Sequence, residues 1–293
     1  MSQLATALGH SFTSPLRYPG GKGALANFMK LVIRENDLMD GHYAEPYAGG
    51  AGVAWPLLFE EYVHCVHIND LNKSVQAFWG AVVDHTEELC KLIRDVPVTM
   101  EQWNRQRVVQ QHPESFSSLE LGFSTFFLNR TNRSGIITGG VIGGKFQGGK
   151  WKLDARFNKQ DLIARIERIA RYAHRIRLYN VDAAVFIRQV IPSLPLRTLV
   201  YLDPPYYGKG QQLYENHYRP PDHEAIAKLT CLEIPQPWIV SYDAAPEIVD
   251  LYRGYESISY SISYSAQRRY QGEEIMFFSP TLCIPQVANP TRP

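Results

Sequence analysis

A strand-like segment of the sequence ends in four residues whose chemistry suits the binding of an aromatic amine. The apolar run 199–202 leads directly into Asp203, Pro204, Pro205 and Tyr206, and the two prolines must end sheet pairing. The Asp203 carboxylate and the Pro204 carbonyl can each accept one hydrogen of an exocyclic amine. Accepting both would localise the nitrogen lone pair and orient it for an in-line attack. Pro205 stiffens the turn, and Tyr206 offers a flat face for an extruded base.

A strand-end Asp before two prolines can also serve only to end the strand, so the upstream sequence matters. The glycine-rich segment 45–52 follows an expected strand and precedes a helix-like stretch. Its glycines allow a tight turn and a close approach of the backbone to a ligand, although a purely structural turn would use them too. The residues expected to meet a ligand here are Glu45, Pro46, Tyr47, Gly49, Gly50 and Gly52.

Asp70 lies 25 residues after Glu45, at the end of the next expected strand. A carboxylate there can accept hydrogen bonds from both ribose hydroxyls of a nucleoside cofactor. The alternative is an N-cap for a helix that begins at Leu71. The glycine turn, this acid and the tetrapeptide together predict a nucleoside-dependent enzyme that acts on an amine.

Hydrophobic periodicity indicates an α/β protein. We expect helices at 22–35, 159–177 and 222–229, and strands at 43–45, 63–70, 199–202 and 238–242. The segment 255–278 contains two strand-like runs that suggest a hairpin. We expect residues 1–80 and 159–293 to form one catalytic domain, interrupted by an inserted subdomain at 81–158.

Composition excludes several classes of protein. The chain of 293 residues is 45% hydrophobic and 20% charged, which is typical of a globular protein with a real core. It shows no signal-peptide pattern and no apolar run of membrane-spanning length, so we expect a cytoplasmic protein. Four scattered cysteines without C-x-x-C spacing or matching histidine pairs predict neither a disulfide framework nor a zinc site. They are Cys65, Cys90, Cys231 and Cys283.

The net charge of +1 conceals an asymmetry along the chain. Residues 91–180 contain 16 Lys and Arg against 7 Asp and Glu, whereas the remainder contains 14 against 22. A basic middle segment is expected of a surface that contacts phosphates, although a solvated helical face gives the same count.

The motifs and their order resemble the Dam-type DNA adenine methyltransferases, in which the motif that binds S-adenosylmethionine (SAM) precedes D-P-P-Y. Segment 17–22, Arg-Tyr-Pro-Gly-Gly-Lys, resembles the family's N-terminal motif, 45–52 its main SAM loop, and Asp70 its ribose-binding acid. Segment 179–182, Tyr-Asn-Val-Asp, resembles the motif beside the adenine ring of SAM. The resemblance covers nearly the whole chain.

This resemblance implies a Rossmann-like SAM-dependent methyltransferase sheet with an inserted, mainly helical target-recognition subdomain and a C-terminal β-hairpin. It implies that SAM is the cofactor, that no metal is needed, and that Tyr18, Lys22, Val181, Asp182 and Asp203 contribute to cofactor binding. Lys22 could instead simply begin a helix, and Asp182 could cap one. Because an ionised Asp only accepts hydrogen bonds, Asp203 favours adenine in DNA over targets that a neutral Asn would suit.

The basic segment 129–150 lies where Dam-like proteins carry a target-recognition hairpin. After Leu128, Asn129 and Arg130, which match the family, the sequence departs from GATC-specific members and leaves the recognition site open. A surface loop without DNA contact is the alternative. The expected DNA contacts, in which arginine suits guanine or phosphate, are Asn129, Arg130, Asn132, Arg133, Lys145 and Lys150.

The resemblance therefore predicts methylation of the N6 amine of an adenine flipped out of double-stranded DNA, by a bacterial or phage protein. The alternatives are an amino-methyltransferase for DNA cytosine or RNA adenine, and a non-catalytic DNA-binding subunit. Candidate protein partners are a cognate restriction endonuclease or defence-system proteins. We expect a monomer, with a dimer as the alternative.

Overall fold

The computed structural model describes residues 13–17, 22–208, 218–264 and 270–293. Its centre is a seven-stranded sheet in the order β3-β2-β1-β4-β5-β7-β6. The strands are β1 (Gly41–Glu45), β2 (Val63–Asn69), β3 (Ile176–Tyr179), β4 (Thr198–Leu202), β5 (Trp238–Asp243), β6 (Ser257–Tyr264) and β7 (Tyr270–Phe278).

Strands β1 to β5 run parallel, whereas β7 lies antiparallel to β5 and forms a hairpin with β6. From β1 the chain adds β2 and β3 on one side, and from β4 it adds β5 on the other side. The strand order therefore reverses between β1 and β4. In open α/β sheets ligands bind at such a switch point, outside the carboxyl ends of the strands. The predicted Rossmann-like sheet with a C-terminal hairpin is confirmed.

Helices cover both faces of the sheet, because each strand buries alternate side chains on opposite sides. One face, which includes Tyr43 and Tyr201, packs against α1, α2 and α3. The other, which includes Ala44 and Val200, packs against the α8 segment, α10 and α11. These helices are α1 (Ala26–Glu35), α2 (Ala54–Phe59), α3 (Lys73–Asp84), α8 (Ala183–Val185, continued by a π-turn at Phe186–Val190), α10 (Pro220–Glu233) and α11 (Pro246–Leu251).

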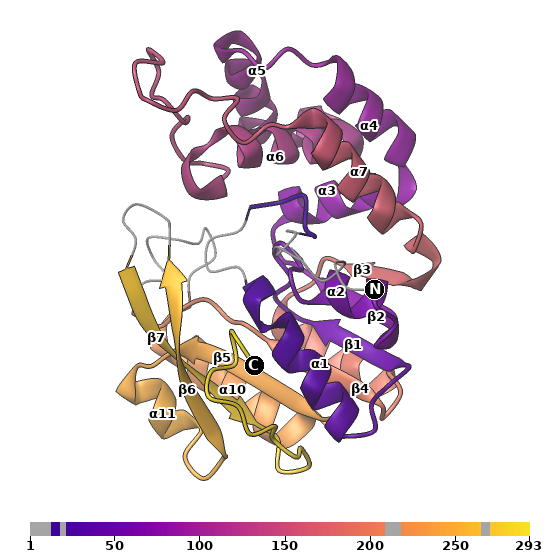
Figure 1. Cartoon of the computed structure of the whole chain (residues 1–293), viewed down its shortest axis with the longest axis vertical. Coiled ribbons are helices and arrows are strands. Elements are labelled where there is room, and N and C mark those ends of the chain that lie inside the picture. The colour runs from indigo at the N-terminus through magenta and orange to yellow at the C-terminus, as the bar shows by residue number, and fades with distance from the viewer. Residues whose placement is uncertain (1–12, 18–21, 209–217, 265–269) are drawn as a thin grey trace, which may run out of the picture.

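A helical part between β2 and β3 lies beyond the sheet, at the top of Figure 1. Besides α3 it contains α4 (Thr86–Asp95), α5 (Met100–Gln111), α6 (Ser118–Thr131) and α7 (Lys159–Ala170). Helix α6 begins at a capping box made by Ser117 and Glu120, and it is buried from Leu121 to Thr131. It therefore forms the centre of this helical part. The predicted boundaries at 80/81 and 158/159 fall within α3 and just before α7.

Most expected elements are confirmed, but the helix expected over 159–177 is too long. Helix α7 ends at Ala170, and Ile176–Tyr179 is the edge strand β3, paired with β2. Arg175 explains the change, because its guanidinium donates to the carbonyls of His64, at 2.6 Å, and Val63, at 2.8 Å. These bonds join the chain to β2. Such a tertiary contact cannot be predicted from helical periodicity. In the part of the chain that the structure describes, no helix is long and apolar enough to cross a bilayer.

The close contact between α3 and α6 depends on Gly122. A Cβ atom at this position would lie 2.5 Å from the carbonyl oxygen of Ala77 and 3.1 Å from the Cβ of Ala81. We predict that Gly122→Ala lowers the free energy of unfolding by about 1–3 kcal/mol, as overpacking does. Urea denaturation of the purified protein measures it.

Gly80 provides a matched control within α3. A Cβ there would meet nothing within 4 Å, so Gly80→Ala should raise the free energy of unfolding by roughly 0.5–1 kcal/mol through helix propensity. Equal effects of the two substitutions would contradict the packing argument.

Candidate active site

The glycine-rich loop after β1 is held in place by residues of β2 and α3. The Gly49 N–H donates to Asp70 Oδ2 at 2.9 Å, and the Trp79 indole N–H donates to the Gly49 carbonyl at 2.9 Å. Gly49 has φ +47° and Ala51 also φ +47°, the left-handed region that glycine adopts without strain. The loop is therefore a defined turn at the switch point of the sheet.

Gly52 brings the N-terminal segment against this loop. A Cβ on Gly52 would lie 3.1 Å from the backbone nitrogen of Gly23, in the turn that precedes α1. The two backbones therefore meet where a side chain would separate them. This places Lys22, the residue before Gly23, beside the glycine loop. Tyr18, the other residue expected from this motif, lies outside the described residues.

Asn69 is a positioning residue that the sequence analysis missed. It is the last residue of β2 and is 1% exposed. Its amide donates to the carbonyls of Pro46, at 3.0 Å, and Val181, at 2.9 Å, while its Oδ1 accepts the Val181 N–H at 3.0 Å. One side chain thus joins the glycine loop to the 179–182 segment. The signal in the sequence was a polar residue between Ile68 and Asp70 at a strand end.

The acids around the loop differ in their surroundings. Asp70 is half-buried, and its Oδ1 accepts the Asn72 N–H at 2.8 Å while Oδ2 holds Gly49. Asp182 is exposed and accepts the Ala184 N–H at 2.8 Å, the N-cap geometry expected as the alternative. Glu45 is buried and accepts the Tyr43 hydroxyl at 2.8 Å. Burial raises the pKa of Glu45 to about 8, although the hydrogen bond from Tyr43 opposes this shift.

A buried lysine connects the tetrapeptide to the hairpin. Lys22 is 5% exposed, and its ammonium lies 3.0 Å from Asp203 Oδ1, 3.1 Å from Glu274 Oε1 and 2.9 Å from the Tyr206 hydroxyl. Glu274 is fully buried in β7 and also accepts the hydroxyls of Tyr206, at 2.6 Å, and Tyr260, at 2.6 Å. Lys22 is therefore more than the start of a helix.

This ion-pair network sets the charge of the site. Burial disfavours the ammonium of Lys22, but the carboxylates of Asp203 and Glu274 outweigh it and raise the pKa of Lys22. Burial also raises the pKa of Asp203, while Lys22 and the Ser241 hydroxyl oppose that shift. Removing Lys22 would leave the two carboxylates without a compensating charge. The three ionisable groups therefore act as one unit.

The two oxygens of the Asp203 carboxylate differ in their hydrogen bonds. Its Oδ1 accepts from Lys22 and from the Ser241 hydroxyl at 2.9 Å, and its side chain is 22% exposed. Among the described residues, none donates a hydrogen bond to its Oδ2 or to the Pro204 carbonyl. These are the two acceptors that the chemistry of an amine requires. The turn after them is fixed by Asp243, which accepts the N–H groups of Tyr207, at 2.9 Å, and Gly208, at 3.0 Å.

Aromatic rings surround the turn, but Tyr206 itself is only 3% exposed. Its hydroxyl is hydrogen-bonded to Lys22 and Glu274. Stacking of a base on this ring stays a prediction, and the burial of the ring does not favour it. The Tyr47 hydroxyl hydrogen-bonds to that of Tyr218 at 2.9 Å, and Tyr218 packs edge-on against His223. These rings form an aromatic wall beside the glycine loop.

Three of the expected DNA contacts lie in the protein interior and need a different interpretation. Asn129 donates to the carbonyls of Arg17 and Gly135, and Asn132 donates to those of Ile136 and Ile137. Arg130 is 9% exposed and donates to the carbonyls of Arg156 and Pro15. These side chains satisfy backbone groups and so shape the loop at the end of α6. Contact of these three residues with DNA stays a prediction that their burial does not favour.

The other three expected contacts are exposed. Arg133, Lys145 and Lys150 project from the loop after α6, which Gln147 holds together through hydrogen bonds to Ile142, Gly144 and Leu153. Two aromatic rings accompany these cations, Phe146, which is fully exposed, and Trp151, which is 63% exposed. Neither ring was among the DNA contacts expected from the sequence.

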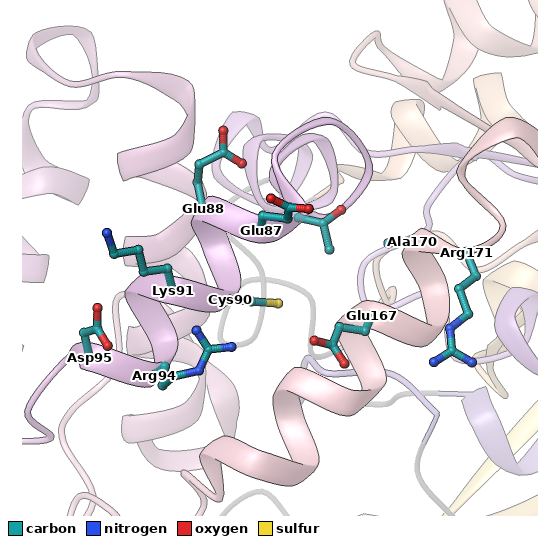
Figure 2. Close-up of a pocket in the computed structure, with 10 residues that line it drawn as sticks. Glu87, Glu88, Cys90, Lys91, Arg94, Asp95, Glu167, Ala170 and Arg171 are labelled. Atoms are coloured by element: carbon teal, nitrogen blue, oxygen red, sulfur yellow. The ribbon is translucent and has the colours of Figure 1, made fainter.

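A shallow hollow of about 970 Å³ lies elsewhere, between α4 and α7 (Figure 2). No residue that we expected in the site contributes to it. Its lining mixes acids and bases, which suits a solvated groove between helices better than a nucleoside pocket: Thr86, Glu87, Glu88, Cys90, Lys91, Arg94, Asp95, Glu167, Ala170 and Arg171.

Comparison with known proteins identifies the family of this chain. A family model described as D12 class N6 adenine-specific DNA methyltransferase matches residues 18–268. The chain belongs to this family. The resemblance to adenine methyltransferases is thereby confirmed, and the protein is a SAM-dependent methyltransferase, as predicted. No protein of curated function matches the chain significantly.

Solved structures similar to this D12-class protein are also methyltransferases, at low sequence identity. A putative RNA methyltransferase from Pyrococcus horikoshii has 10% identity, covers 87% of this chain and 81% of its own, and gives a TM-score of 0.43. The rRNA methyltransferase AviRa from Streptomyces viridochromogenes has 11% identity, coverages of 90% and 88%, and a TM-score of 0.42. A putative class I SAM-dependent methyltransferase from Listeria monocytogenes has 10% identity, coverages of 96% and 67%, and a TM-score of 0.39.

The residues at the switch point fit SAM, the cofactor that the sequence predicted. The turn at Gly49 has no side chain to obstruct a ligand, and each Asp70 oxygen, bound to one N–H, keeps a lone pair for a ribose hydroxyl. The Val181 backbone, held by Asn69, lines the neighbouring strand end. The nucleoside part of SAM would be held by the glycine loop, Asp70 and Val181.

Asp70 should make SAM binding depend on pH. Burial raises its pKa to about 6, against the N–H groups of Asn72 and Gly49. Only the ionised carboxylate keeps all its acceptor sites, so we predict that SAM affinity is constant above this pKa. Below it, affinity should fall by up to about tenfold per pH unit. Calorimetric titrations from pH 5 to 8 measure this.

Asp70→Asn is the control, because the amide keeps an acceptor and cannot titrate. In this variant the pH dependence near 6 should disappear. If the variant retains it, another group is responsible.

Proposed function

We propose that this protein transfers a methyl group from SAM to the N6 amine of an adenine turned out of double-stranded DNA at a specific site. The observation that carries the proposal is Asp203, whose Oδ1 is held by Lys22 and Ser241 while Oδ2 and the Pro204 carbonyl face no donor among the described residues. Two acceptors on adjacent residues match the two hydrogens of an exocyclic amine. Family membership supports adenine as the base.

When bound, SAM supplies an electrophilic methyl group. The residues of this chain bring the amine to it and prepare its nitrogen. Asp203 and the Pro204 carbonyl would accept the amine hydrogens and so localise the lone pair. Lys22 opposes the effect of burial on Asp203 and favours its ionised form. Asp243 keeps the turn rigid through two backbone N–H groups, so that both acceptors keep their orientation.

Removal of the Asp203 carboxylate should abolish methyl transfer without loss of SAM. In Asp203→Ala, Lys22 keeps its ion pair with Glu274, so the fold should persist. We predict that kcat falls by at least roughly 10²–10³-fold, the loss seen when a preorganised hydrogen-bonding group is removed. Steady-state assays with labelled SAM and DNA measure kcat, and calorimetry measures SAM binding.

Asp250→Ala is the matched control. Asp250 is an exposed acid on α11 that pairs with Arg253, so this variant should keep full activity. Methyl transfer by Asp203→Ala at the rate of the unmodified protein would disprove the assignment.

The base and the nucleic acid are settled by identifying the product. With labelled SAM, we expect N6-methyladenine in duplex DNA. N4-methylcytosine in DNA or methyladenine in RNA would instead establish the alternative amine substrates. Absence of SAM binding would favour a non-catalytic DNA-binding subunit. We place the enzyme in the cytoplasm, where a restriction endonuclease or another defence protein is the candidate partner.

The proposed DNA surface is the loop that carries Arg133, Lys145 and Lys150. Exposed cations neutralise phosphates, and the exposed rings of Phe146 and Trp151 offer faces on which bases stack. The interior residues Asn129 and Asn132 act indirectly by holding this loop to Arg17 and to its own backbone. In this proposal the exposed side chains contact DNA, and the buried side chains hold the loop in its shape.

Loss of two loop cations should weaken DNA binding in a salt-dependent manner. For Lys145→Ala combined with Lys150→Ala, we predict a slope of log affinity against log salt that is shallower by roughly 0.9 for each phosphate contact removed. Fluorescence anisotropy across a salt series measures the slope.

The control removes the same charge elsewhere, through Lys91→Ala combined with Arg171→Ala at the hollow between α4 and α7 (Figure 2). It should leave the slope unchanged. If both double variants shift the slope equally, binding depends on net charge and not on this loop.

A further inference from the structure

Two histidines and a cysteine meet on the sheet at a distance from the catalytic turn along their strands. His42 lies in β1, and Cys65 and His67 lie in β2. The register pairs His42 with Cys65 and Ala44 with His67, so all three side chains share the face of the sheet that carries α8 and α10. One ligand atom from each lies within 4.8 Å of the others.

We propose that His42, Cys65 and His67 form a binding site for a divalent metal ion of the zinc type, with its remaining coordination position open to solvent. Imidazole nitrogen and thiolate sulfur are the ligands that Zn²⁺ prefers, and three protein ligands with one open position is a common arrangement. The cysteine and histidines come from strands that only the folded sheet brings together, which is why their sequence spacing gave no sign of a site.

The spacing of the two histidine nitrogens is close to what one ion needs. His42 Nδ1 and His67 Nε2 lie 3.0 Å apart, and a tetrahedral ion with bonds of about 2.0–2.1 Å needs its two nitrogens roughly 3.3–3.4 Å apart. The ring planes are inclined by 27°, with 5.1 Å between the ring centroids. Binding therefore requires the side chains to turn until both lone pairs and the Cys65 sulfur point at one ion. His42 is half-buried, whereas Cys65 and His67 are each 5% exposed. Solvent therefore reaches the site from the side of His42.

Tyr179 provides the outer contact that ligating histidines usually have. Its hydroxyl lies 3.1 Å from His67 Nδ1. If His67 donates its Nδ1 proton to this oxygen, the lone pair of Nε2 faces His42 and the ion. Such partners fix the tautomer and the ring orientation of the ligand. This contact would hold His67 in the orientation that metal binding requires.

Metal binding at this site needs a simple proton balance. Each neutral imidazole binds through a nitrogen lone pair, and Cys65 binds as a thiolate, so its thiol proton passes to solvent. Arg177, Asp40 and His64 are the charged or titratable neighbours of His42.

The ion would have no part in methyl transfer. His67 lies three residues before Asp70, roughly 10 Å along the strand. An ion bound by His42, Cys65 and His67 would cross-link β1 and β2 below the loops that these strands carry. Its expected effect is on the stability of the sheet, and the test does not depend on the nature of the methylated base.

Titration of the chelator-treated full-length protein with Co²⁺ tests the proposal. We expect one equivalent to bind with d–d bands in the visible and a thiolate-to-cobalt charge-transfer band in the near ultraviolet. Zn²⁺ should displace the Co²⁺ and raise the thermal unfolding midpoint. Cys65→Ser should remove the charge-transfer band, and His42→Gln should weaken binding at least roughly tenfold. Tyr179→Phe should weaken binding about 10–100-fold, as is usual for outer partners of metal ligands.

Cys283→Ser is the matched control, because Cys283 is an exposed cysteine outside the site. It should leave the spectrum and the affinity unchanged. Co²⁺ binding without a sulfur band, or with a band that survives both Cys65→Ser and His42→Gln, would overturn the proposal, as would the absence of binding. Since His42 is half-buried, His42→Gln keeps the test decisive if Cys65→Ser fails to fold.

Discussion

The ion pairs of Lys22 are the interaction on which the geometry of the candidate site depends. A buried ammonium is stable only when it is compensated, and here Asp203 and Glu274 compensate it from two different elements. Because Asp203 follows β4 and Glu274 lies in β7, the network fixes the N-terminal segment, the turn after β4 and the hairpin relative to one another. Tyr206 and Tyr260 complete the hydrogen bonds of Glu274.

The parallel strands place a polar residue at nearly every carboxyl end. Some of these residues hold the loops in place, and others have acceptors left for a ligand. Asp203 faces the site with one oxygen, whereas Asp243 after it holds backbone N–H groups. Asn69 ties together two loops, and Asp70 beside it retains lone pairs for a ligand. Neighbouring residues at one edge of the sheet therefore serve as scaffold and as binding groups in alternation.

In the helical part, too, some polar residues hold the backbone and others are exposed. Asn129, Arg130 and Asn132 are buried and bind backbone carbonyls, which fixes the loop that exposes Lys145 and Lys150. A polar residue in a motif that resembles a DNA-binding segment need not touch DNA. Its contribution can lie in satisfying backbone groups that would otherwise be buried without a partner.

The sequence by itself determined the fold class and the positions of the two loops that form the candidate site, and its resemblance to a known family implied the cofactor. The two loops follow from local chemistry, such as prolines after an apolar strand at Asp203, or glycines that permit the turn at Gly49. It also predicted most helices and strands, since periodicity reports which face is buried. It failed at 171–179, where the apolar residues of a strand continued the spacing of a helix.

Only the tertiary structure decided which polar side chains face a ligand and which face the backbone. Burial and partners are set by contacts between residues far apart in the chain, as for Lys22 and Glu274, 252 positions apart. The same holds for His42, Cys65 and His67, whose spacing in the sequence predicts nothing. The pairing of β1 with β2 places them side by side, because strand register, and not sequence distance, determines which side chains meet.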